Sequence, residues 1–200
     1  MPVVGVLALQ GDFREHIQVL EALGAHARPV RLPRDLEGLD ALVIPGGEST
    51  TMRRLLAAYE LLEPVRELAG EGKPIYGTCA GCILLAREVD GSPSGELGLM
   101  DIGVRRNAYG SQVDSFETDV VAPALGDEPL RAIFIRAPRI ERVGPGVEPL
   151  AHLEDGTIVA ARQGNLLVST FHPELTDDRR FHRYFLERLV AATGEQVAAR

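Results

Sequence analysis

The residue best suited to chemistry is a cysteine on a turn of small residues. The segment Gly77-Thr78-Cys79-Ala80-Gly81 follows the apolar run Pro74-Ile75-Tyr76. Its glycines permit a tight bend between a strand and a helix, and they keep bulky side chains away from the sulfur. A thiol at the start of a helix also lies at the positive end of the helix dipole, which favours the reactive thiolate. The sequence therefore predicts that Cys79 is a nucleophile.

A base and a carboxylate stand far downstream in Phe171-His172-Pro173-Glu174. Because proline disfavours helical backbone in the residue before it, we expect an extended segment in which His172 and Glu174 project to the same face. Glu174 then accepts a hydrogen bond from one ring nitrogen, and the other nitrogen takes the thiol proton. With Cys79 these residues predict a Cys-His-Glu hydrolase. Taken alone, the segment also fits a surface histidine beside carboxylates that cap the last helix.

A glycine-rich loop, Pro45-Gly46-Gly47-Glu48-Ser49-Thr50-Thr51, precedes a predicted helix. It lacks the glycine spacing and the lysine of a nucleotide phosphate loop. We expect an oxyanion hole formed by the amides of Gly47 and Ala80, since such donors act best when aimed at a tetrahedral oxyanion. Helix capping by Ser49 or Thr50 is compatible with the same loop.

Cys79 and Cys82 are the only cysteines, and they leave other interpretations open. Their C-x-x-C spacing is also typical of a thiol redox module. A zinc site would need a second cysteine or histidine pair at ligand spacing, which is absent. We expect Cys82 to be a packing residue. The remaining histidines are expected to be structural or solvent-facing, namely His16, His26, His152 and His182.

The composition sets limits on the class of protein. The chain has 200 residues, of which 45% are hydrophobic, enough for one buried core. A net charge of −8 argues against a nucleic-acid-binding protein. The N-terminus does not resemble a signal peptide, and no apolar segment approaches the roughly 20 residues that span a bilayer. We therefore expect a cytoplasmic protein that binds neither nucleic acid nor membrane.

Apolar runs alternate with helical patterns in the first half of the chain, which predicts parallel βαβ units. From residue 91 to residue 170 short β-like runs dominate, which suggests an antiparallel extension, and a closing helix is expected at residues 178–192. We expect one α/β domain over residues 1–200. The predicted strands are 3–9, 27–32, 41–44, 74–78, 98–105, 116–121, 132–135, 157–161 and 166–170, and the predicted helices are 12–23, 50–62, 64–69 and 80–87.

These elements bring the reactive residues together. Cys79, the Gly46-Gly47 pair and His172 each follow a predicted strand. Reactive groups in open α/β sheets gather at the carboxyl ends of the strands, so all three are expected at one edge of the sheet.

The cysteine turn together with His172-Pro173-Glu174 resembles the class I (triad) glutamine amidotransferases. More narrowly, the chain is similar to the glutaminase subunits of two-part pyridoxal 5′-phosphate synthases. The similar segments extend over essentially the whole chain. They are Gly5-Val6-Leu7-Ala8-Leu9-Gln10-Gly11, Glu15-His16, the loop from Pro45 to Thr51, Arg105-Arg106-Asn107-Ala108-Tyr109-Gly110, Phe134-Ile135-Arg136-Ala137-Pro138 and Phe171-His172-Pro173-Glu174.

The resemblance implies a flavodoxin-like three-layer sandwich with a mainly parallel sheet and an antiparallel extension. It implies the triad Cys79, His172 and Glu174, and it places Gln10 and the N-terminal loops toward a synthase partner. It also implies a set of glutamine-binding residues, which are Gly47, Glu48, Ser49, Arg106, Ile135 and Arg136.

The implied activity is hydrolysis of L-glutamine to L-glutamate and ammonia, which needs no metal, nucleotide or organic cofactor. The implied partner is a synthase subunit with a (β/α)₈ barrel, which consumes the ammonia in pyridoxal 5′-phosphate synthesis. Two alternatives remain open: a glutaminase subunit of a different amidotransferase, and the C-x-x-C redox module.

Overall fold

A seven-stranded sheet forms the centre of the molecule in the computed structural model, which describes residues 1–94, 96–109 and 115–193. Gly110 and the last seven residues of the expected domain lie outside these ranges. Five strands are parallel, and β12 and β11 add to one side in antiparallel fashion. In spatial order the strands are β11 (Glu148–His152), β12 (Ile158–Gln163), β13 (Leu166–Ser169), β4 (Ile75–Thr78), β3 (Ala41–Ile44), β1 (Val3–Leu7) and β2 (His26–Val30).

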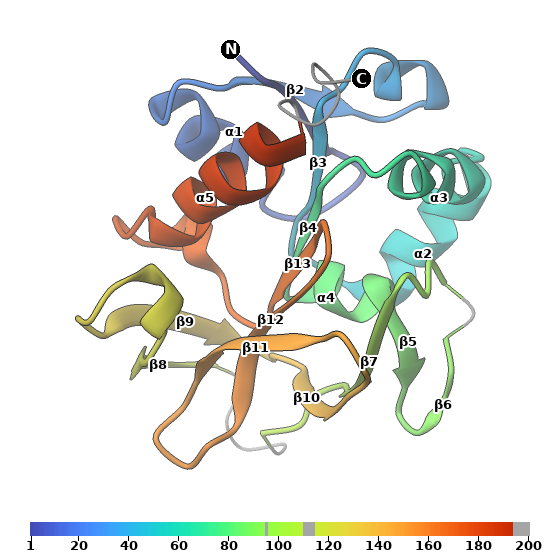
Figure 1. The fold of residues 1–200 in the computed structure, drawn as a ribbon. Coiled ribbons are helices and arrows are strands. Elements are labelled where there is room, and N and C mark those ends of the chain that lie inside the picture. Colours follow the sequence, from blue (N-terminus) through green and yellow to red (C-terminus); the bar gives the residue numbers. More distant parts are fainter. Residues whose placement is uncertain (95, 110–114, 194–200) are drawn as a thin grey trace.

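Helices cover both faces of this sheet (Figure 1). On one face lie α1 (Phe13–Ala22), α5 (Arg180–Tyr184) and its π-helical continuation η4 (Phe185–Val190). On the other lie α2 (Ser49–Ala58), α3 (Leu62–Gly70) and α4 (Ala80–Leu85).

The side chains of the central strands fill two separate hydrophobic clusters. Val43 packs in the cluster that contains Phe181 of α5, whereas its neighbours Leu42 and Ile44 pack in the cluster that contains Met52 of α2. Since successive strand residues point to opposite faces, a continuous apolar run is what a sheet covered on both faces requires. The expected three-layer α/β fold is confirmed.

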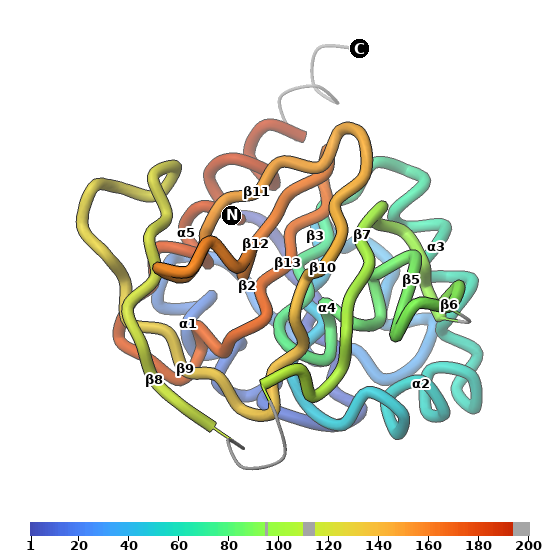
Figure 2. The backbone as a smooth tube through the Cα atoms, turned by 90° about the horizontal axis from the view of Figure 1, so that it is seen from below, coloured from blue at the N-terminus to red at the C-terminus, as the bar shows by residue number. Residues whose placement is uncertain are grey.

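Two smaller sheets flank the central one (Figure 2). A four-stranded sheet has the order β10 (Arg139–Val143), β7 (Met100–Arg105), β5 (Ala86–Val89) and β6 (Ser92–Pro93). A hairpin pairs β8 (Ser115–Val120) with β9 (Leu130–Ile135). Of the runs predicted as an antiparallel extension, only 157–161, in β12, pairs in that way within the central sheet, with β11 beyond it. The run 166–170 forms the parallel strand β13, and the other three runs lie in the two smaller sheets. Short 3₁₀ turns occur at η1 (Pro33–Leu36), η2 (Pro123–Leu125) and η3 (Pro173–Leu175).

Some predicted boundaries differ from the structure for a tertiary reason. The helix after the cysteine ends at Leu85, not at residue 87, because Ala86 begins β5 and pairs with Met100 of β7. The strands β5, β6, β10 and β11 were not predicted, since their sequences carry charged residues or proline and take strand form through pairing. Among the described residues no helix has the length and apolar character needed to cross a membrane.

Candidate active site

Cys79 occupies the sharp turn between β4 and α4. Its backbone has φ +46° and ψ −102°, a conformation that a non-glycine residue seldom adopts and that recurs at functional sites. The turn is tight because α4 lies directly against β3: a Cβ added to Gly81 would lie 2.1 Å from the carbonyl oxygen of Ile44. The glycine is thus required for the close approach that presents Cys79 at the end of the strand.

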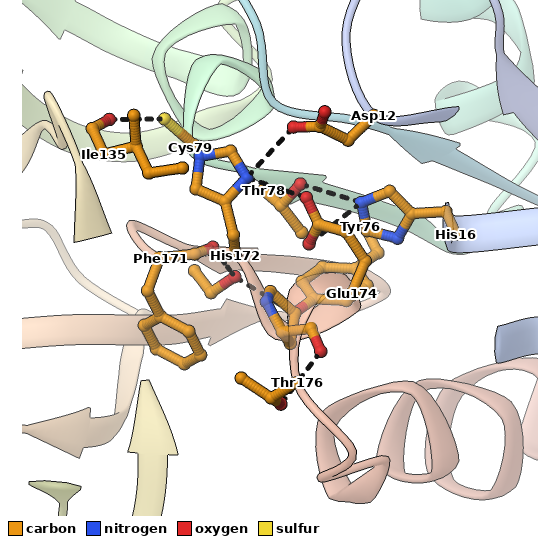
Figure 3. Close-up of polar contacts among 12 residues, drawn as sticks. Asp12, His16, Tyr76, Thr78, Cys79, Ile135, Phe171, His172, Glu174 and Thr176 are labelled. Carbon is orange, nitrogen blue, oxygen red and sulfur yellow. Dashed lines mark hydrogen bonds and ion pairs between the residues drawn. The ribbon is translucent and has the colours of Figure 1, made fainter. Parts of the chain in front are cut away.

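His172 and Glu174 form a buried hydrogen-bonded pair. His172 Nδ1 lies 2.7 Å from Glu174 Oε1 (Figure 3), and the two residues are only 3% and 5% exposed. The expectation of an extended segment was wrong, because Pro173 begins the 3₁₀ turn η3. This turn brings the two side chains into contact where an extended strand would keep them parallel. The surface-histidine interpretation is excluded by their burial.

The charges around His172 favour its protonated form. Burial alone lowers the pKa of His172, but hydrogen bonds to Asp12, Cys79 and Glu174 outweigh it and raise the pKa to about 12. Burial likewise raises the pKa of Glu174, yet the nearby His16 and His172 outweigh it and hold that pKa well below its usual range. Asp12 Oδ2 lies 3.4 Å from His172 Nδ1, so a second carboxylate that the sequence analysis did not identify faces the ring.

Two further histidines lie behind Glu174, and both are completely buried. His16 Nδ1 is 2.9 Å from His182 Nε2, and His16 Nε2 is 3.1 Å from Thr78 Oγ1. His16 Nε2 is also 3.3 Å from Glu174 Oε2. The sequence carried one sign of this burial: His16 lies four positions before the buried Leu20 on the same helix face. Neither histidine is solvent-facing.

A cavity of about 670 Å³ opens beside Cys79 and His172. Its wall includes six residues to which the sequence analysis gave no role in catalysis or glutamine binding, namely Gln10, Asp12, Thr50, Ile83, Asp90 and Asn107. It also includes all six residues that the resemblance associates with glutamine, namely Gly47, Glu48, Ser49, Arg106, Ile135 and Arg136. Glu174 and Ala80 do not line it; Glu174 is buried behind the ring, and Ala80 follows Cys79 at the start of α4.

The glycine loop is held by two side chains, Glu48 and Gln10, for which the sequence analysis gave other roles. The N-cap of α2 is Glu48, not Ser49 or Thr50, and its carboxylate accepts from the amides of Thr50 and Thr51. A hydrogen bond from the Thr51 hydroxyl, followed by these amides, lowers the pKa of Glu48 to about 2. Gln10 Oε1 accepts from the Glu48 amide at 2.8 Å. A Cβ on Gly47, whose φ is +147°, would lie 2.5 Å from that same oxygen.

The remaining residues singled out from the sequence have distinct surroundings. Arg106 Nε donates to Asp90 at 2.7 Å, so the guanidinium is both paired and at the cavity wall. Cys79 Sγ lies 3.8 Å from the carbonyl oxygen of Ile135. Arg136 is exposed and has φ +41°. Cys82 is fully buried, and burial raises the pKa of its thiol.

A metal site usually needs three or more histidine, cysteine, aspartate or glutamate side chains whose ligand atoms lie close together. Within the described part of the chain one such group occurs: the ligand atoms of Asp12, His172 and Glu174 lie within 4.8 Å of one another. The contacts between His172 Nδ1 and both carboxylates account for this spacing without an ion. We interpret the group as a hydrogen-bonded charge cluster.

Comparison with known proteins gives consistent matches. Residues 6–191 match the SNO glutamine amidotransferase family. "Pyridoxal 5′-phosphate synthase subunit PdxT" of Chloroflexus aurantiacus is 59% identical over 187 residues, which cover 92% of this chain and 98% of the relative. The protein of the same name from Pelotomaculum thermopropionicum is 60% identical over 189 residues, covering 94% of this chain and 96% of that one.

Solved structures share the fold. A crystal structure described as a glutamine amidotransferase superposes with a TM-score of 0.88 at 51% identity, covering 94% of this chain and 98% of that one. The structure of PurLQS from Thermotoga maritima superposes with a TM-score of 0.73 at 18% identity, covering 94% and 100%, and shows the similarity of fold alone.

Proposed function

Because this chain belongs to the SNO glutamine amidotransferase family, we propose that it works as the glutaminase subunit of a pyridoxal 5′-phosphate synthase. It hydrolyses L-glutamine to L-glutamate and ammonia, and the ammonia is used in vitamin B6 synthesis. In this proposal residues 1–200 act as one glutaminase domain, and Cys79, His172 and Glu174 are its catalytic residues.

The observation that carries the catalytic assignment is the placement of His172 between a buried carboxylate and the cysteine turn. Nδ1 is hydrogen-bonded to Glu174, which leaves Nε2 to exchange a proton with Cys79. The ring also packs against the glycine loop, since a Cβ on Gly46 would lie 2.3 Å from His172 Cε1. A redox module built on Cys79 and Cys82 would need neither Glu174 nor the glycine loop.

The reaction begins when the Cys79 thiolate attacks the side-chain carboxamide carbon of glutamine and forms a C–S bond. The amides of Gly47 and Ala80 stabilise the negative oxygen of the tetrahedral intermediate. His172, protonated at Nε2, gives that proton to the leaving nitrogen, so that ammonia departs and a thioester remains. His172 then takes a proton from water, the hydroxide attacks the thioester, and the C–S bond breaks to give glutamate and regenerate the thiolate.

Glutamine is held at the cavity wall in this proposal. Support comes from the shared cavity, which Cys79 lines together with Gly47, Glu48, Ser49, Arg106, Ile135 and Arg136. The Arg106 guanidinium, although paired with Asp90, adds positive charge suited to the substrate α-carboxylate. Ile135 supplies apolar surface for the methylene groups.

The partner in this proposal is the synthase subunit, a (β/α)₈ barrel that accepts the ammonia. Free ammonia is protonated and lost in water, so a glutaminase benefits from docking on the enzyme that consumes it. Glutaminase turnover is therefore expected to be low for the isolated chain and to rise when the synthase is added. A glutaminase serving a different synthase would show no such rise, and it would transfer no nitrogen into pyridoxal 5′-phosphate.

The experiment measures glutamate release by the purified chain, with and without the barrel subunit, for wild type, Cys79→Ala and Cys82→Ala. We expect Cys79→Ala to abolish release and to leave the circular dichroism spectrum unchanged. Cys82→Ala should retain activity, since its side chain lies in the core away from the cavity wall. Survival of activity without Cys79 would refute the triad, and loss of function with either cysteine would favour the redox module.

A further inference from the structure

Behind Glu174 lies a chain of buried polar side chains that the proposed mechanism does not use. His16 comes from α1, Thr78 from the end of β4 and His182 from α5. All three are 0% exposed. The contacts run from His182 Nε2 to His16 Nδ1 at 2.9 Å and from His16 Nε2 to Glu174 Oε2 at 3.3 Å. Polar groups at this depth are retained only when their hydrogen bonds are satisfied, so the arrangement of protons is constrained.

The ionised state of Glu174 fixes the proton on His16. Glu174 Oε1 is already bonded to His172 Nδ1, while Oε2 has no partner of regular hydrogen-bond geometry among the described residues. A carboxylate only accepts hydrogen bonds, so His16 Nε2, which lies between Glu174 Oε2 and the Thr78 hydroxyl, must carry a hydrogen. His16 Nδ1 is then the atom left to bond with His182.

His182 lies at the far end of this row of buried polar side chains. Burial, followed by the neighbouring His16, lowers the pKa of His182 to about 3, so the ring is neutral and has one hydrogen. Its Nδ1 is buried without a hydrogen-bond partner in the described part of the chain. A hydrogen on Nδ1 would be an orphaned buried donor, whereas a hydrogen on Nε2 is shared with His16 Nδ1. His16 Nε2 therefore presents its hydrogen to the Glu174 carboxylate 3.3 Å away, and His182 Nε2 contacts His16 Nδ1 on the other side of the ring.

We propose that His16 and His182 are positioning residues that hold the Glu174 carboxylate ionised and aligned on His172. Through Glu174 they influence the proton exchange between His172 and Cys79. The proposal rests on the proposed function, since it assigns Glu174 to the triad. The titratable groups that face Glu174 from the surrounding elements are His172 on its own segment, Asp12 before α1, His16 on α1, Tyr76 on β4 and His182 on α5.

The first test compares two amides at one position, His16→Gln and His16→Asn. The glutamine amide nitrogen reaches the place of Nε2, whereas the shorter asparagine reaches only that of Nδ1. We expect His16→Asn to lower kcat by about 10- to 100-fold, as the loss of a hydrogen-bond partner behind a metal-ligating side chain does. In His16→Asn the low-pH limb of the plot of kcat against pH should move to higher pH, because Glu174 without a donor is protonated more readily. His16→Gln should stay within a few-fold of wild type with an unshifted profile.

The second test uses His182→Gln and His182→Leu, of which only the glutamine can still hydrogen-bond to His16. We expect the leucine variant to shift the acid limb in the same direction as His16→Asn, by a smaller amount, and the glutamine variant to leave it in place. The exposed His26→Asn is the control. If a His16 variant does not fold, the His182 pair decides the question alone.

A third measurement, the rate of alkylation of Cys79 by iodoacetamide against pH, separates the two proposals because it needs no glutamine. The modified peptide is identified by mass spectrometry. The protein could lack glutaminase activity while the pH profile of Cys79 alkylation still shifts in His16→Asn and His182→Leu and stays in place in His16→Gln and His182→Gln. That result would refute the proposed function and support the positioning role. Profiles of activity and alkylation in folded His16→Asn and His182→Leu that superimpose on wild type would overturn the positioning role and leave the triad intact.

Discussion

Two carboxylates that differ in distance and exposure face the same nitrogen of His172. Glu174 is buried and 2.7 Å away, whereas Asp12 is 3.4 Å away and has a side chain that is 38% exposed. Water screens the charge of Asp12, so its effect on the imidazolium is expected to be smaller than that of Glu174. Both carboxylates nevertheless favour the protonated ring, which is the form that donates a proton to the leaving ammonia in the proposed mechanism.

This difference gives a prediction for Asp12→Asn. Removing the charge removes one of the causes that raise the pKa of His172, so that pKa should fall, by about one unit or less because the site is partly solvated. The imidazolium is then lost at a lower pH, and the high-pH limb of the plot of kcat against pH should move to lower pH. Titration of the His172 ring protons by NMR measures the same shift. Asp119→Asn on β8 is the control, and an unmoved His172 titration would show that Asp12 plays no part.

At the scale of elements, the site depends on how closely α4 approaches β3. Cys79 is the N-cap of a helix of only six residues, and Gly81 in the first turn of that helix lies against the backbone of Ile44. Packing between a helix and a strand at this distance leaves no room for a side chain. The same contact sets where the Cys79 sulfur lies relative to His172, so the geometry of the turn and the stability of the sheet are linked.

We therefore predict that Gly81→Ala destabilises the protein by about 1–3 kcal/mol, the range found for overpacked cores. The matched control is Gly70→Ala at the end of α3, where an added Cβ meets nothing within 4 Å. That substitution should be neutral, or stabilising by about 0.4–1 kcal/mol, because alanine restricts the unfolded chain. Urea unfolding gives both values. Equal midpoints for the two variants would mean that α4 shifts to accept the methyl group at no cost.

At the scale of the whole molecule, the buried polar chain ties together parts of the fold that are distant in sequence. His16 and His182 are separated by 166 positions, and their contact joins α1 to α5 beneath the turn that carries Cys79. Because His182 must stay neutral to remain buried, the stability of the fold is linked to pH.

The sign of this linkage follows from the pKa of His182, which is about 3 in the folded protein and 6.5 as its ordinary value. Between these values the unfolded state binds a proton that the folded state does not, so the free energy of unfolding falls as pH falls from 6.5 toward 3. One proton gives a slope of up to about 1.4 kcal/mol per pH unit. Glu174, whose pKa is lowered in the folded state, adds a further loss below 4.5.

We predict that His182→Gln flattens this dependence between pH 6.5 and 4.5, because glutamine does not titrate. Urea midpoints measured from pH 4.5 to pH 8 give the comparison, with the exposed His26→Gln as control. A slope in His182→Gln as steep as that of wild type would assign the acid sensitivity to other groups.

The sequence by itself determined the three-layer fold and which segments meet at one edge of the central sheet. The apolar runs that form β3 and β4, the glycines around Cys79 and the triplet His172-Pro173-Glu174 are local patterns, so neighbouring residues suffice to encode them. The lining of one cavity by Cys79, His172 and the glycine loop follows from the rule that loops gather at the carboxyl ends of parallel strands.

Only the tertiary structure decided what supports those residues. The 3₁₀ turn at Pro173, the cap supplied by Glu48, the second carboxylate of Asp12 and the His16–His182 pair had no local signature strong enough to predict. The contacts of Asp12 and of the His16–His182 pair depend on which side chain from elsewhere in the chain reaches a partly or fully buried group, whereas the Glu48 cap and the turn at Pro173 join near neighbours whose geometry the sequence pattern did not specify. Packing sets that choice, and the amino-acid sequence near each residue does not.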